Sequence, residues 1–567
     1  MDKEWKIWEK APDSIDRELK DFSPLIRQML FRRGIMTKAE AEDFLKAEYE
    51  GLHSPFLFQD MAKASERIWR ALENREKITV YADYDADAVT AAAVLLRCLR
   101  YLGAEAGSYI PDRFTEGYGV NLQAIEKIIN EGSKLIITVD CGTNSTDAAE
   151  LCLSLGADLV VTDHHEIIGG LPKALALINP KNPNDRYPYH ELTGVGVAFK
   201  LAQALLEDER AKIREGYVPG WEKWLLDLVA IGTVADCHAL LGENRILVKY
   251  GLKVLEKSRW AGLKALCAAA GADFTRTSPD TYTLGFMLAP RLNAAGRLEH
   301  AGVALNLLLE DDAVLAQEKA MALNAINERR QNLTQSVLSE AREQALAYQD
   351  RPVLLLYKEG WPKGVVGLVA GRLAEETGKP VLVLEKGENE STGSARTQGE
   401  FNLIEALKPA AHLLAKFGGH SQAAGLTVPN QNLEAFYKIL ISQAEKQASG
   451  ANHPVVWLEA ELAESDLNLE SVSEIAKFEP FGIGNPRPKF LILGLKVQSL
   501  KLVGSVGQHA QIRLAAGAKE VPAIAFNAFE KIKGLKTGDV VSVAAELVRE
   551  EWNGQRLKLK ISDLKIN

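Results

Sequence analysis

The sequence predicts an α/β protein that contains a parallel-sheet domain, a long connector helix, a second α/β domain and a C-terminal β-barrel. Between residues 76 and 180, short β-branched runs alternate with stretches rich in Ala and Leu, which is the pattern of a parallel sheet with crossover helices. Residues 311–349 contain neither Gly nor Pro and therefore predict one long helix. Beyond residue 455, five short strand-like runs separated by turns predict a small barrel.

Length and composition agree with a globular protein of several domains. At 567 residues the chain is too long for one hydrophobic core and is expected to form three or four domains. With 47% hydrophobic and 25% charged residues, wholesale disorder is not expected. No apolar segment follows the N-terminus and no run approaches the roughly 20 apolar residues of a membrane span, so we expect a cytoplasmic protein. The five cysteines are odd in number and lack Cys-x-x-Cys spacing, which disfavours a disulfide framework and a thiolate zinc site.

Each predicted part follows from its local pattern. Residues 1–75 show helical periodicity and are expected to pack on the first α/β domain. In that domain, stretches rich in Ala and Leu predict helices at 89–102 and 144–155. The second α/β unit is predicted to contain two strands, one helix and two Gly-rich turns, at 352–357, 380–384, 365–376, 393–396 and 418–420. The barrel strands are predicted at 490–497, 510–514, 521–526, 540–547 and 556–561.

Charge is unevenly distributed along the chain. The net charge of −9 alone argues against a nucleic-acid partner, but residues 481–567 contain 14 Lys and Arg against 7 Asp and Glu. Five strands in a basic segment fit a barrel of the oligonucleotide-binding type; a solvated, lysine-rich surface is the alternative. Four aromatic residues are candidates for stacking on bases, although core packing is the expected role of most of them: Phe481, Phe490, Phe526 and Trp552.

Metal-ligand side chains follow three hydrophobic runs of the predicted parallel sheet. These side chains are Asp83, Asp85 and Asp87 after 77–81, Asp140 after 134–139, and Asp163, His164 and His165 after 158–161. Sites in such sheets lie at the carboxyl ends of the strands, so the three runs predict one shared divalent-metal site. Carboxylates with a few imidazoles suit Mn²⁺ or Mg²⁺ better than Zn²⁺. For the first three carboxylates alone, a solvated acidic turn or a calcium site is the alternative.

Two further motifs are ambiguous on their own. Asp236 follows the apolar run 228–235 and could bind a metal or cap a helix, and His238 is expected to be structural. Arg291 and Arg297 flank small residues, which would permit the close approach and bidentate binding of a phosphate. Ordinary salt bridges on a helix surface are equally consistent with these two arginines.

Five motifs stand in a fixed order: Asp83-Tyr84-Asp85-Ala86-Asp87, Val139-Asp140-Cys141-Gly142, Asp163-His164-His165, Gly232-Thr233-Val234-Ala235-Asp236 and Pro290-Arg291-Leu292-Asn293-Ala294-Ala295-Gly296-Arg297. In this order the chain resembles the DHH phosphoesterases and, more narrowly, the RecJ family. The resemblance runs from about Ser23 to the end, with 418–425 similar to a DHH-associated domain and 479–486 similar to the entry to an oligonucleotide-binding (OB) domain. It implies a DHH domain at 76–310, the connector at 311–349, a DHH-associated domain at 350–450 and an OB-like domain at 455–567.

The resemblance also implies a set of site residues. Two Mn²⁺ or Mg²⁺ ions would be held by Asp83, Asp85, Asp87, Asp140, His164 and Asp236. His165 would act beside the scissile phosphate with Asp163 orienting an imidazole, so that Asp140, Asp163 and His165 form the catalytic group. A terminal 5′ phosphate would be received by Arg113, Ser394 and Arg396. Contacts along the strand would come from Arg291, Asn293, Arg297, Gly418, Gly419 and His420.

The implied activity is a 5′-to-3′ exonuclease that hydrolyses single-stranded DNA to 5′-mononucleotides in DNA repair and recombination. A phosphodiesterase acting on short RNA or cyclic dinucleotides, a pyrophosphatase and a non-catalytic single-strand-binding protein are the alternatives. The sequence departs from the family at Ala88, where Gly is usual and a positive φ would be disfavoured, and at Pro362, where His is usual. The resemblance further implies a bacterial monomer that works at the nucleoid with single-strand-binding protein and a RecQ-type helicase.

Overall fold

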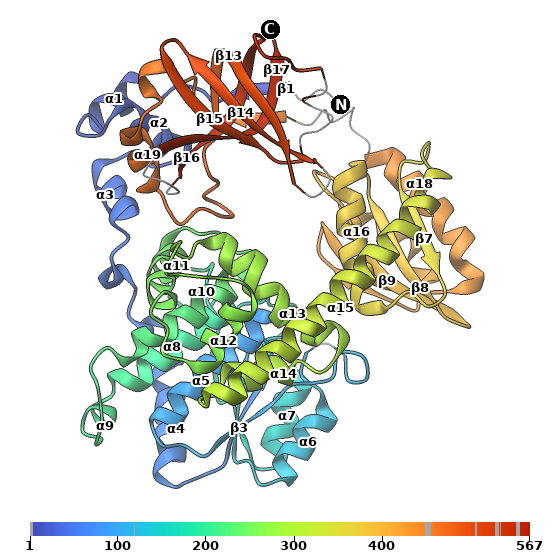
Figure 1. The fold of residues 1–567 in the computed structure, drawn as a ribbon. Coiled ribbons are helices and arrows are strands. Elements are labelled where there is room, and N and C mark those ends of the chain that lie inside the picture. The colour runs from blue at the N-terminus through green and yellow to red at the C-terminus, as the bar shows by residue number, and fades with distance from the viewer. Residues whose placement is uncertain are drawn as a thin grey trace.

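The computed structural model has the predicted α/β architecture with a parallel-sheet domain, a connector helix, a second α/β domain and a C-terminal barrel (Figure 1). It describes residues 4–117, 119–447, 455–504, 507–527, 532, 534–550 and 556–567. Within these ranges, no helix combines the length and the apolar character needed to cross a membrane.

The first α/β domain contains a five-stranded, all-parallel sheet in the order β3-β2-β4-β5-β6. Its strands are β2 (Ile78–Ala82), β3 (Ala106–Tyr109), β4 (Leu135–Val139), β5 (Asp158–Thr162) and β6 (Ala176–Ile178). In the register of the sheet, Ala82 pairs with Val139 and Val139 with Thr162. The residues that follow these three positions therefore leave the sheet side by side at its carboxyl edge.

Helices cover this sheet and extend the domain. They are α4 (Met61–Glu73), α5 (Ala86–Tyr101), α6 (Leu122–Asn130), α7 (Thr146–Ser154), α8 (Gly194–Glu207) and α9 (Glu209–Lys212). A helical extension follows with α10 (Leu226–Ala235), α11 (Gly242–Leu255), α12 (Ala261–Ala269), α13 (Ala289–Leu298) and α14 (Gly302–Leu308). Helices α5, α8 and α10 pack on one another and share one hydrophobic core, so their ends have fixed positions relative to the sheet.

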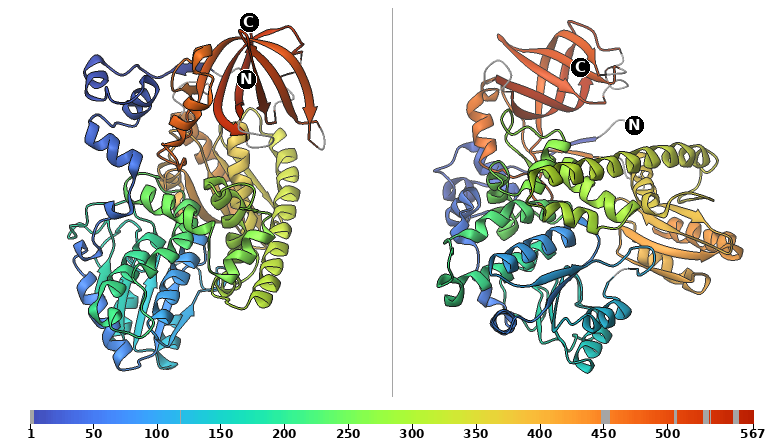
Figure 2. Two further views of the ribbon diagram at one scale, coloured as in Figure 1. Left: turned by 60° about the vertical axis from the view of Figure 1, so that its left-hand side comes forward. Right: turned by 60° about the horizontal axis from the view of Figure 1, so that its bottom comes forward.

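The predicted connector is the helix α15 (Ala313–Leu346), which begins in the first α/β domain and ends in the second (Figures 1 and 2). Asp312 caps its N-terminus by accepting hydrogen bonds from Val314 N and Leu315 N, both 2.9 Å long. Along its length α15 contacts α12, α13 and α14, and then α16 and β7 of the second domain. Because α15 packs against both domains, it can hold them at a defined separation.

The second α/β domain has a mixed sheet in the order β10-β11-β9-β8-β7. Its strands are β7 (Leu354–Lys358), β8 (Val381–Lys386), β9 (Glu390–Arg396), β10 (Lys416–Gly419) and β11 (Ala423–Pro429), and its helices are α16 (Lys363–Thr377), α17 (Leu403–Leu407) and α18 (Leu433–Gln447). The prediction of Gly-rich turns was wrong at 393–396, which lies in β9, and at Gly418 and Gly419, which lie in β10. A Cβ on Gly393 would lie 2.7 Å from Leu384 Cα, so glycine here permits a neighbouring strand to approach closely.

The C-terminal segment forms a closed barrel in the order β13-β14-β15-β17-β16. Its strands are β13 (Phe490–Val503), β14 (His509–Ala516), β15 (Lys519–Ala525), β16 (Val540–Glu550) and β17 (Arg556–Ile566), each overlapping a predicted strand. Of the predicted stacking candidates, Phe481 and Phe490 are buried core residues and Phe526 is exposed. Trp552 lies outside the described residues.

The N-terminal segment differs from its prediction because most of it packs on the C-terminal module. It forms β1 (Glu4–Ile7), α1 (Asp13–Glu18), α2 (Pro24–Arg32) and α3 (Lys38–Lys46) before α4. Strand β1 pairs with β12 (Val455–Leu458), and the buried face of α2 joins a core with Phe478 and Phe490. Only α4 and the turns before it pack in the core of the first domain. Periodicity showed that these helices have an apolar face, but it carried no information about which partner covers that face.

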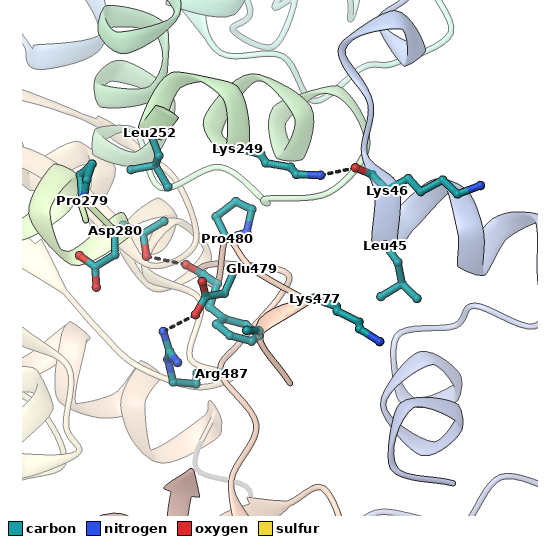
Figure 3. A pocket seen from close by; sticks show the side chains of 13 residues that line it. Leu45, Lys46, Lys249, Leu252, Pro279, Asp280, Lys477, Glu479, Pro480 and Arg487 are labelled. Atoms are coloured by element: carbon teal, nitrogen blue, oxygen red, sulfur yellow. Dashed lines mark hydrogen bonds and ion pairs between the residues drawn. The ribbon is translucent and has the colours of Figure 1, made fainter. Parts of the chain in front are cut away.

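One buried arginine joins the N-terminal segment, the first domain and the C-terminal module. Arg245 of α11 donates hydrogen bonds to Phe44 O at 2.9 Å, to Phe478 O at 2.7 Å and to Lys477 O at 3.2 Å. Beside it lies a cavity of about 520 Å³ between α3, α11 and the segment that precedes the barrel (Figure 3). The segment that precedes the barrel is therefore attached directly to the first α/β domain.

Candidate metal centre

The predicted metal ligands come together at the carboxyl edge of the parallel sheet. Nε2 of His164 lies 3.0 Å from Asp140 Oδ1, 3.6 Å from Asp236 Oδ2 and 3.9 Å from Asp87 Oδ2. Asp140 and His164 are almost completely buried. Asp140 also has a φ of 58°, a left-handed conformation that is uncommon for a residue other than Gly.

Two overlapping groups of ligand atoms have metal-binding spacing. One comprises Asp140, His164 and His165, and the other comprises His164, Asp236 and His238, with all ligand atoms of a group within 4.8 Å of one another. Asp236 ends α10, and its carboxylate, 3.2 Å from His238 Nε2, points into the cluster rather than capping the helix. The prediction that His238 is structural did not foresee its place beside Asp236; its position two residues after a predicted ligand was the only available sequence signal.

Backbone N–H groups position the carboxylates of the first motif. Asp85 caps α5 by accepting a hydrogen bond from Ala88 N at 3.0 Å. Asp87 accepts hydrogen bonds from Gly194 N at 2.7 Å and from Val195 N at 3.0 Å, at the beginning of α8. These contacts hold two carboxylates toward the sheet edge, where charge would otherwise drive them apart.

The carboxylates are crowded and poorly solvated. Burial and the charge of Asp85 raise the pKa of Asp83 to about 7. Burial and the charge of Asp236 raise the pKa values of Asp85 and Asp87, and burial together with Asp87 raises that of Asp140. A bound divalent cation would relieve this repulsion and return the carboxyl groups to their ionised form.

Several buried polar atoms in the cluster fit such a cation. Among the described side chains, Asp83 Oδ1, Asp140 Oδ1 and His164 Nδ1 are buried without a hydrogen-bond partner. Buried polar atoms in proteins are normally hydrogen-bonded, so unpaired carboxylate oxygens at a converging cluster fit a bound divalent cation. Burial lowers the pKa of His164 to about 4, which keeps its imidazole neutral and able to bind a metal.

Asp163 does not join the ligand cluster but fixes the imidazole of His165. Its Oδ1 lies 2.8 Å from His165 Nδ1 and accepts a hydrogen bond from His164 N at 2.7 Å. Burial opposes ionisation of Asp163, but the hydrogen bond and charge of His165 lower its pKa below the ordinary value. Burial likewise opposes charge on His165, but the hydrogen bond to Asp163 raises its pKa overall. The pair thus favours a cationic, oriented imidazole next to the carboxylates.

Gly194 and Gly296 permit close contacts that the sequence analysis did not predict. A Cβ on Gly194 would lie 2.5 Å from Asp140 Cβ and 2.6 Å from its Cγ, so only glycine lets α8 begin against Asp140. Gly296 of α13 lies against the backbone carbonyl of Tyr84. Asn293, one turn earlier, accepts a hydrogen bond from Ala86 N at 2.9 Å and so ties α13 to the first metal motif.

A cluster of arginines lies next to the carboxylates. The charges of Arg113, Arg330 and Arg396 act on Arg297, whose pKa is lowered to about 10 by burial and by this like-charge repulsion. Arg297 donates a hydrogen bond to Gly364 O at 3.3 Å in the second domain. The cluster therefore collects cations from both α/β domains and would be relieved by an anion.

Ser394 and Arg396 converge at Gly367, where an added Cβ would lie 3.2 Å from both Ser394 Oγ and Arg396 Nη2. The guanidinium of Arg113 lies 4.7 Å from the ring centre of Tyr84 in the first metal motif. Arg330, on α15, was not predicted; among the described side chains its Nε is buried without a hydrogen-bond partner. The sequence of this helix is typical of a charged, solvated surface. Nothing in the local sequence therefore distinguishes Arg330 from its neighbour Arg329.

Not every predicted residue lies in this cluster. Arg291 donates hydrogen bonds to Asn324 Oδ1 at 2.9 Å and to Met287 O at 2.6 Å, so its guanidinium is directed toward α15. Gly418 and Gly419 lie in the edge strand β10, and His420 is exposed directly after it. Their contact with a substrate stays a prediction.

The two departures from the family are accommodated without strain. Ala88 lies in the first turn of α5 and is not among the residues with positive φ, so its methyl group meets no conformational penalty there. Pro362 is the N-cap of α16, where its missing N–H costs no hydrogen bond.

The sequence matches three family models in succession. They are the "DHH family, N-terminal domain" at residues 77–233, the "DHHA1 domain" at 350–446 and the "RecJ OB domain" at 458–563. The first two matched ranges contain the sheets of the two α/β domains, and the third contains the barrel up to residue 563.

Similar proteins are known from several bacteria. The chain is 36% identical over 570 residues to the single-stranded-DNA-specific exonuclease RecJ of Bacillus subtilis, a match that covers 99% of this chain and 71% of the relative. It is 31% identical over 553 residues to the protein of the same name from Escherichia coli, with 94% of each chain covered. A crystal structure of RecJ in complex with Mn²⁺ from Thermus thermophilus superposes with a TM-score of 0.83 at 31% identity, covering 99% of this chain and 79% of that one. A structure of RecJ with Mg²⁺ from the same organism gives a TM-score of 0.76 at 29% identity and covers 99% of this chain and 78% of that one.

Proposed function

The chain belongs to the RecJ family of single-stranded-DNA-specific exonucleases, and we propose that it removes 5′-mononucleotides one at a time from the 5′ end of single-stranded DNA. The observation that best supports this reaction is the position of the arginine cluster next to a buried cluster of carboxylates and imidazoles. The first fits a terminal phosphate and the second fits the metal ions of a phosphodiester hydrolase.

We assign the metal ligands to the side chains that converge at the sheet edge. Asp83, Asp85, Asp87, Asp140, His164 and Asp236 would hold two ions, and the Mn²⁺ and Mg²⁺ complexes of the relatives support these metals. When bound, the ions supply Lewis-acid catalysis: they make water more acidic and neutralise negative charge on the phosphate. His238 would orient Asp236 through its 3.2 Å contact.

His165 and Asp163 would act on the scissile phosphate as a unit. The hydrogen bond that His165 Nδ1 donates to Asp163 sets the orientation of the imidazole and favours its cationic form. In that form His165 can stabilise the charge that develops on the phosphate oxygens or donate a proton to the leaving oxygen. The hydrogen bonds of Asp163 go to the His165 imidazole and to the backbone N–H groups of Thr143, His164 and His165, so its role would be positioning.

The polarity of the reaction would come from the arginine cluster. Arg113, Ser394 and Arg396 would bind the terminal 5′ phosphate, with Arg297 behind them. An anion pocket at a fixed distance from the metal centre allows the chain to be cut only one nucleotide from that end. Arg291, Asn293 and His420, together with Gly418 and Gly419, would contact the strand farther along.

The remaining assignments rest on family membership and on the C-terminal barrel. The basic barrel would guide single-stranded DNA toward the metal centre. We further propose that the protein acts as a monomer in DNA repair and recombination in the bacterial cytoplasm, together with single-strand-binding protein and a RecQ-type helicase.

The test is a hydrolysis assay with the full chain, Mn²⁺ and a 5′-labelled single-stranded oligonucleotide. We expect labelled mononucleotide as the first product, with no release from a matched duplex or from a 3′ label at early times. Asp140→Asn retains the shape of the side chain and removes its charge, so it should abolish release. Absence of mononucleotide release by the unaltered chain, or equal release by Asp140→Asn, would refute the proposal. A cyclic dinucleotide and a short RNA provide the comparison with other substrates of this superfamily.

A further inference from the structure

Two large aromatic side chains, Tyr282 and Phe286, are exposed on one face of the helix that leads to α13. Tyr282 is 61% exposed and Phe286 is 71% exposed. Their rings stack on each other, with centroids 5.1 Å apart and an angle of 16° between the planes. Single exposed apolar residues are ordinary, but an ordered, stacked pair that leaves most of both rings in solvent indicates a binding surface.

Phe286 lies in a π-helical segment, Thr283–Leu288, which Tyr282 directly precedes and which continues directly into α13. On the opposite face, a Cβ on Gly285 would lie 3.2 Å from Val234 of α10, two residues before the predicted ligand Asp236. Isolated π-helical turns inside helices occur frequently at functional sites. The inner face of this segment therefore supports the metal centre while its outer face presents the two rings.

The same helical rod leads from the two rings to the metal motif. Phe286 and Asn293 are seven residues apart, about 10 Å along a helix axis. Asn293 is bonded to Ala86 in the first metal motif, and Arg297, one turn further, lies in the arginine cluster. A strand that follows this rod would pass from the aromatic pair to the catalytic groups.

The other end of the rod is fixed to the C-terminal module. Thr281 Oγ1 donates a hydrogen bond to Phe481 O at 2.7 Å. Tyr282 then lines a cavity of about 1140 Å³ whose opposite side is formed by barrel residues, including Val548 and Arg549. The aromatic pair thus lies between the barrel and the metal centre.

Charge in this cavity does not by itself attract a polyanion. Its four basic residues are matched by four acidic ones, and two of the basic residues, Arg487 and Lys560, form ion pairs with Glu479 and Glu546. A DNA strand that crosses this cavity must then be held by another interaction. Stacking on aromatic rings is such an interaction for unpaired bases. An apolar protein partner would also fit exposed rings, but the continuity of the rod with the metal centre favours the substrate.

We propose that Tyr282 and Phe286 form a base-stacking platform that holds single-stranded DNA between the barrel and the metal centre. The inference rests on the proposed function for the identity of the strand, and it adds a positioning site several nucleotides from the cut. Stacking is possible only for bases that are unpaired, so the platform contributes to the selection of single strands.

The experiment compares long and short substrates with the full chain. Stacking of a base on an aromatic ring contributes about 1–3 kcal/mol, equivalent to about 5-fold to 140-fold in affinity. We expect the double variant Tyr282→Leu, Phe286→Leu to bind a 20-nucleotide oligothymidylate at least 5-fold more weakly in EDTA. In Mn²⁺, its KM for that oligonucleotide should rise by a similar factor, while its hydrolysis of a 5′-phosphorylated dinucleotide stays within 2-fold of the unaltered chain.

Leucine retains apolar surface but has no aromatic ring. A site that binds an apolar protein would therefore lose little affinity for it, whereas a stacking site would lose its affinity for bases. Phe56→Leu is the matched control, because Phe56 is 45% exposed on a short turn near the N-terminus. The substitution Tyr282→Trp, Phe286→Tyr should restore affinity. Equal affinity of the leucine variant and the unaltered chain for the long oligonucleotide would overturn the inference, as would an equal loss on the dinucleotide. The binding measurement does not depend on cleavage, so failure of the platform and failure of the proposed nuclease reaction give different results.

Discussion

Replacement of Gly194 by alanine should damage the metal centre although residue 194 carries no functional side chain. Gly194 begins α8 and its N–H donates to Asp87 at 2.7 Å, while its Cα faces the side chain of Asp140. A methyl group there would lie 2.5 Å from Asp140 Cβ and 2.6 Å from Cγ. Gly194 does not have a positive φ, so the backbone itself accepts alanine and the effect comes from this overlap alone.

The size of the effect follows from the overlap. Carbon atoms in contact lie about 3.5–4.0 Å apart, so Asp140 or the start of α8 must move by about 1 Å. A displacement of that size at a catalytic group costs roughly 100-fold in rate. Overpacking of this kind typically costs about 1–3 kcal/mol of folding free energy, which a domain of this size can tolerate. We therefore expect a folded protein with about 100-fold lower kcat and weaker binding of Mn²⁺.

The assay measures kcat on a single-stranded oligonucleotide and the Mn²⁺ dependence of the melting temperature. Gly107→Ala is the matched control, because Gly107 lies in β3 of the same sheet, lacks a positive φ and has no heavy atom within 4 Å of an added Cβ. The control should resemble the unaltered chain in both measurements. A Gly194→Ala protein with kcat within 3-fold of normal and unchanged response to Mn²⁺ would refute the argument.

Three other outcomes can be measured. Arg396→Lys retains the charge but loses the guanidinium fork, so the preference for a 5′-phosphate over a 5′-hydroxyl end should fall about 10-fold; an unchanged ratio of rates would contradict the assignment. In the unaltered chain the buried carboxylate of Glu243 lies 2.7 Å from Lys200 Nζ. Lys200→Met leaves this carboxylate without its cation, so urea unfolding should show that the free energy of unfolding falls by about 3–5 kcal/mol. Much of this loss should be recovered when Glu243 is also replaced by Gln. Burial raises the pKa of Asp227 to about 7, so the folded state holds a proton that the unfolded chain releases near pH 4, and stability falls as pH rises between these values. Asp227→Asn should therefore lose less melting temperature than the unaltered chain between pH 5 and pH 8, and identical pH profiles would show that Asp227 does not titrate in this way.

Much of the candidate site could be predicted because its signals are local. Asp83, Asp140 and Asp163 each follow directly after a strand, and strands of a parallel sheet end at one edge, so their proximity follows from the order of elements. The barrel strands were predicted for a similar reason, since short strand-like runs and the turns that separate them are local features of the sequence. Asp236 could not be separated from an ordinary helix cap without knowing that the end of α10 meets the sheet edge.

Other features had no local signal. Glycine has the same appearance in sequence whether it makes a turn or permits close packing, which explains both the error at Gly393 and the failure to predict Gly194. The helices before residue 47 showed an apolar face, but their partner lies more than 400 residues away in the C-terminal module. Arg330 has the sequence context of a solvated helix and becomes part of the arginine cluster only because α15 packs between the two α/β domains.

The sequence by itself determined which side chains are candidate metal ligands, which strands carry them and which family of hydrolases the chain belongs to. The tertiary structure alone decided how those side chains are arranged. It brings the carboxylates of Asp140 and Asp236 within 3.6 Å of the His164 imidazole and places the arginines of two domains next to them. The physical reason is the distance along the chain over which each feature is set. Strand patterns and ligand types depend on neighbouring residues, whereas the distances between strand ends, helix ends and domains depend on how α8, α10 and α15 pack over the whole chain.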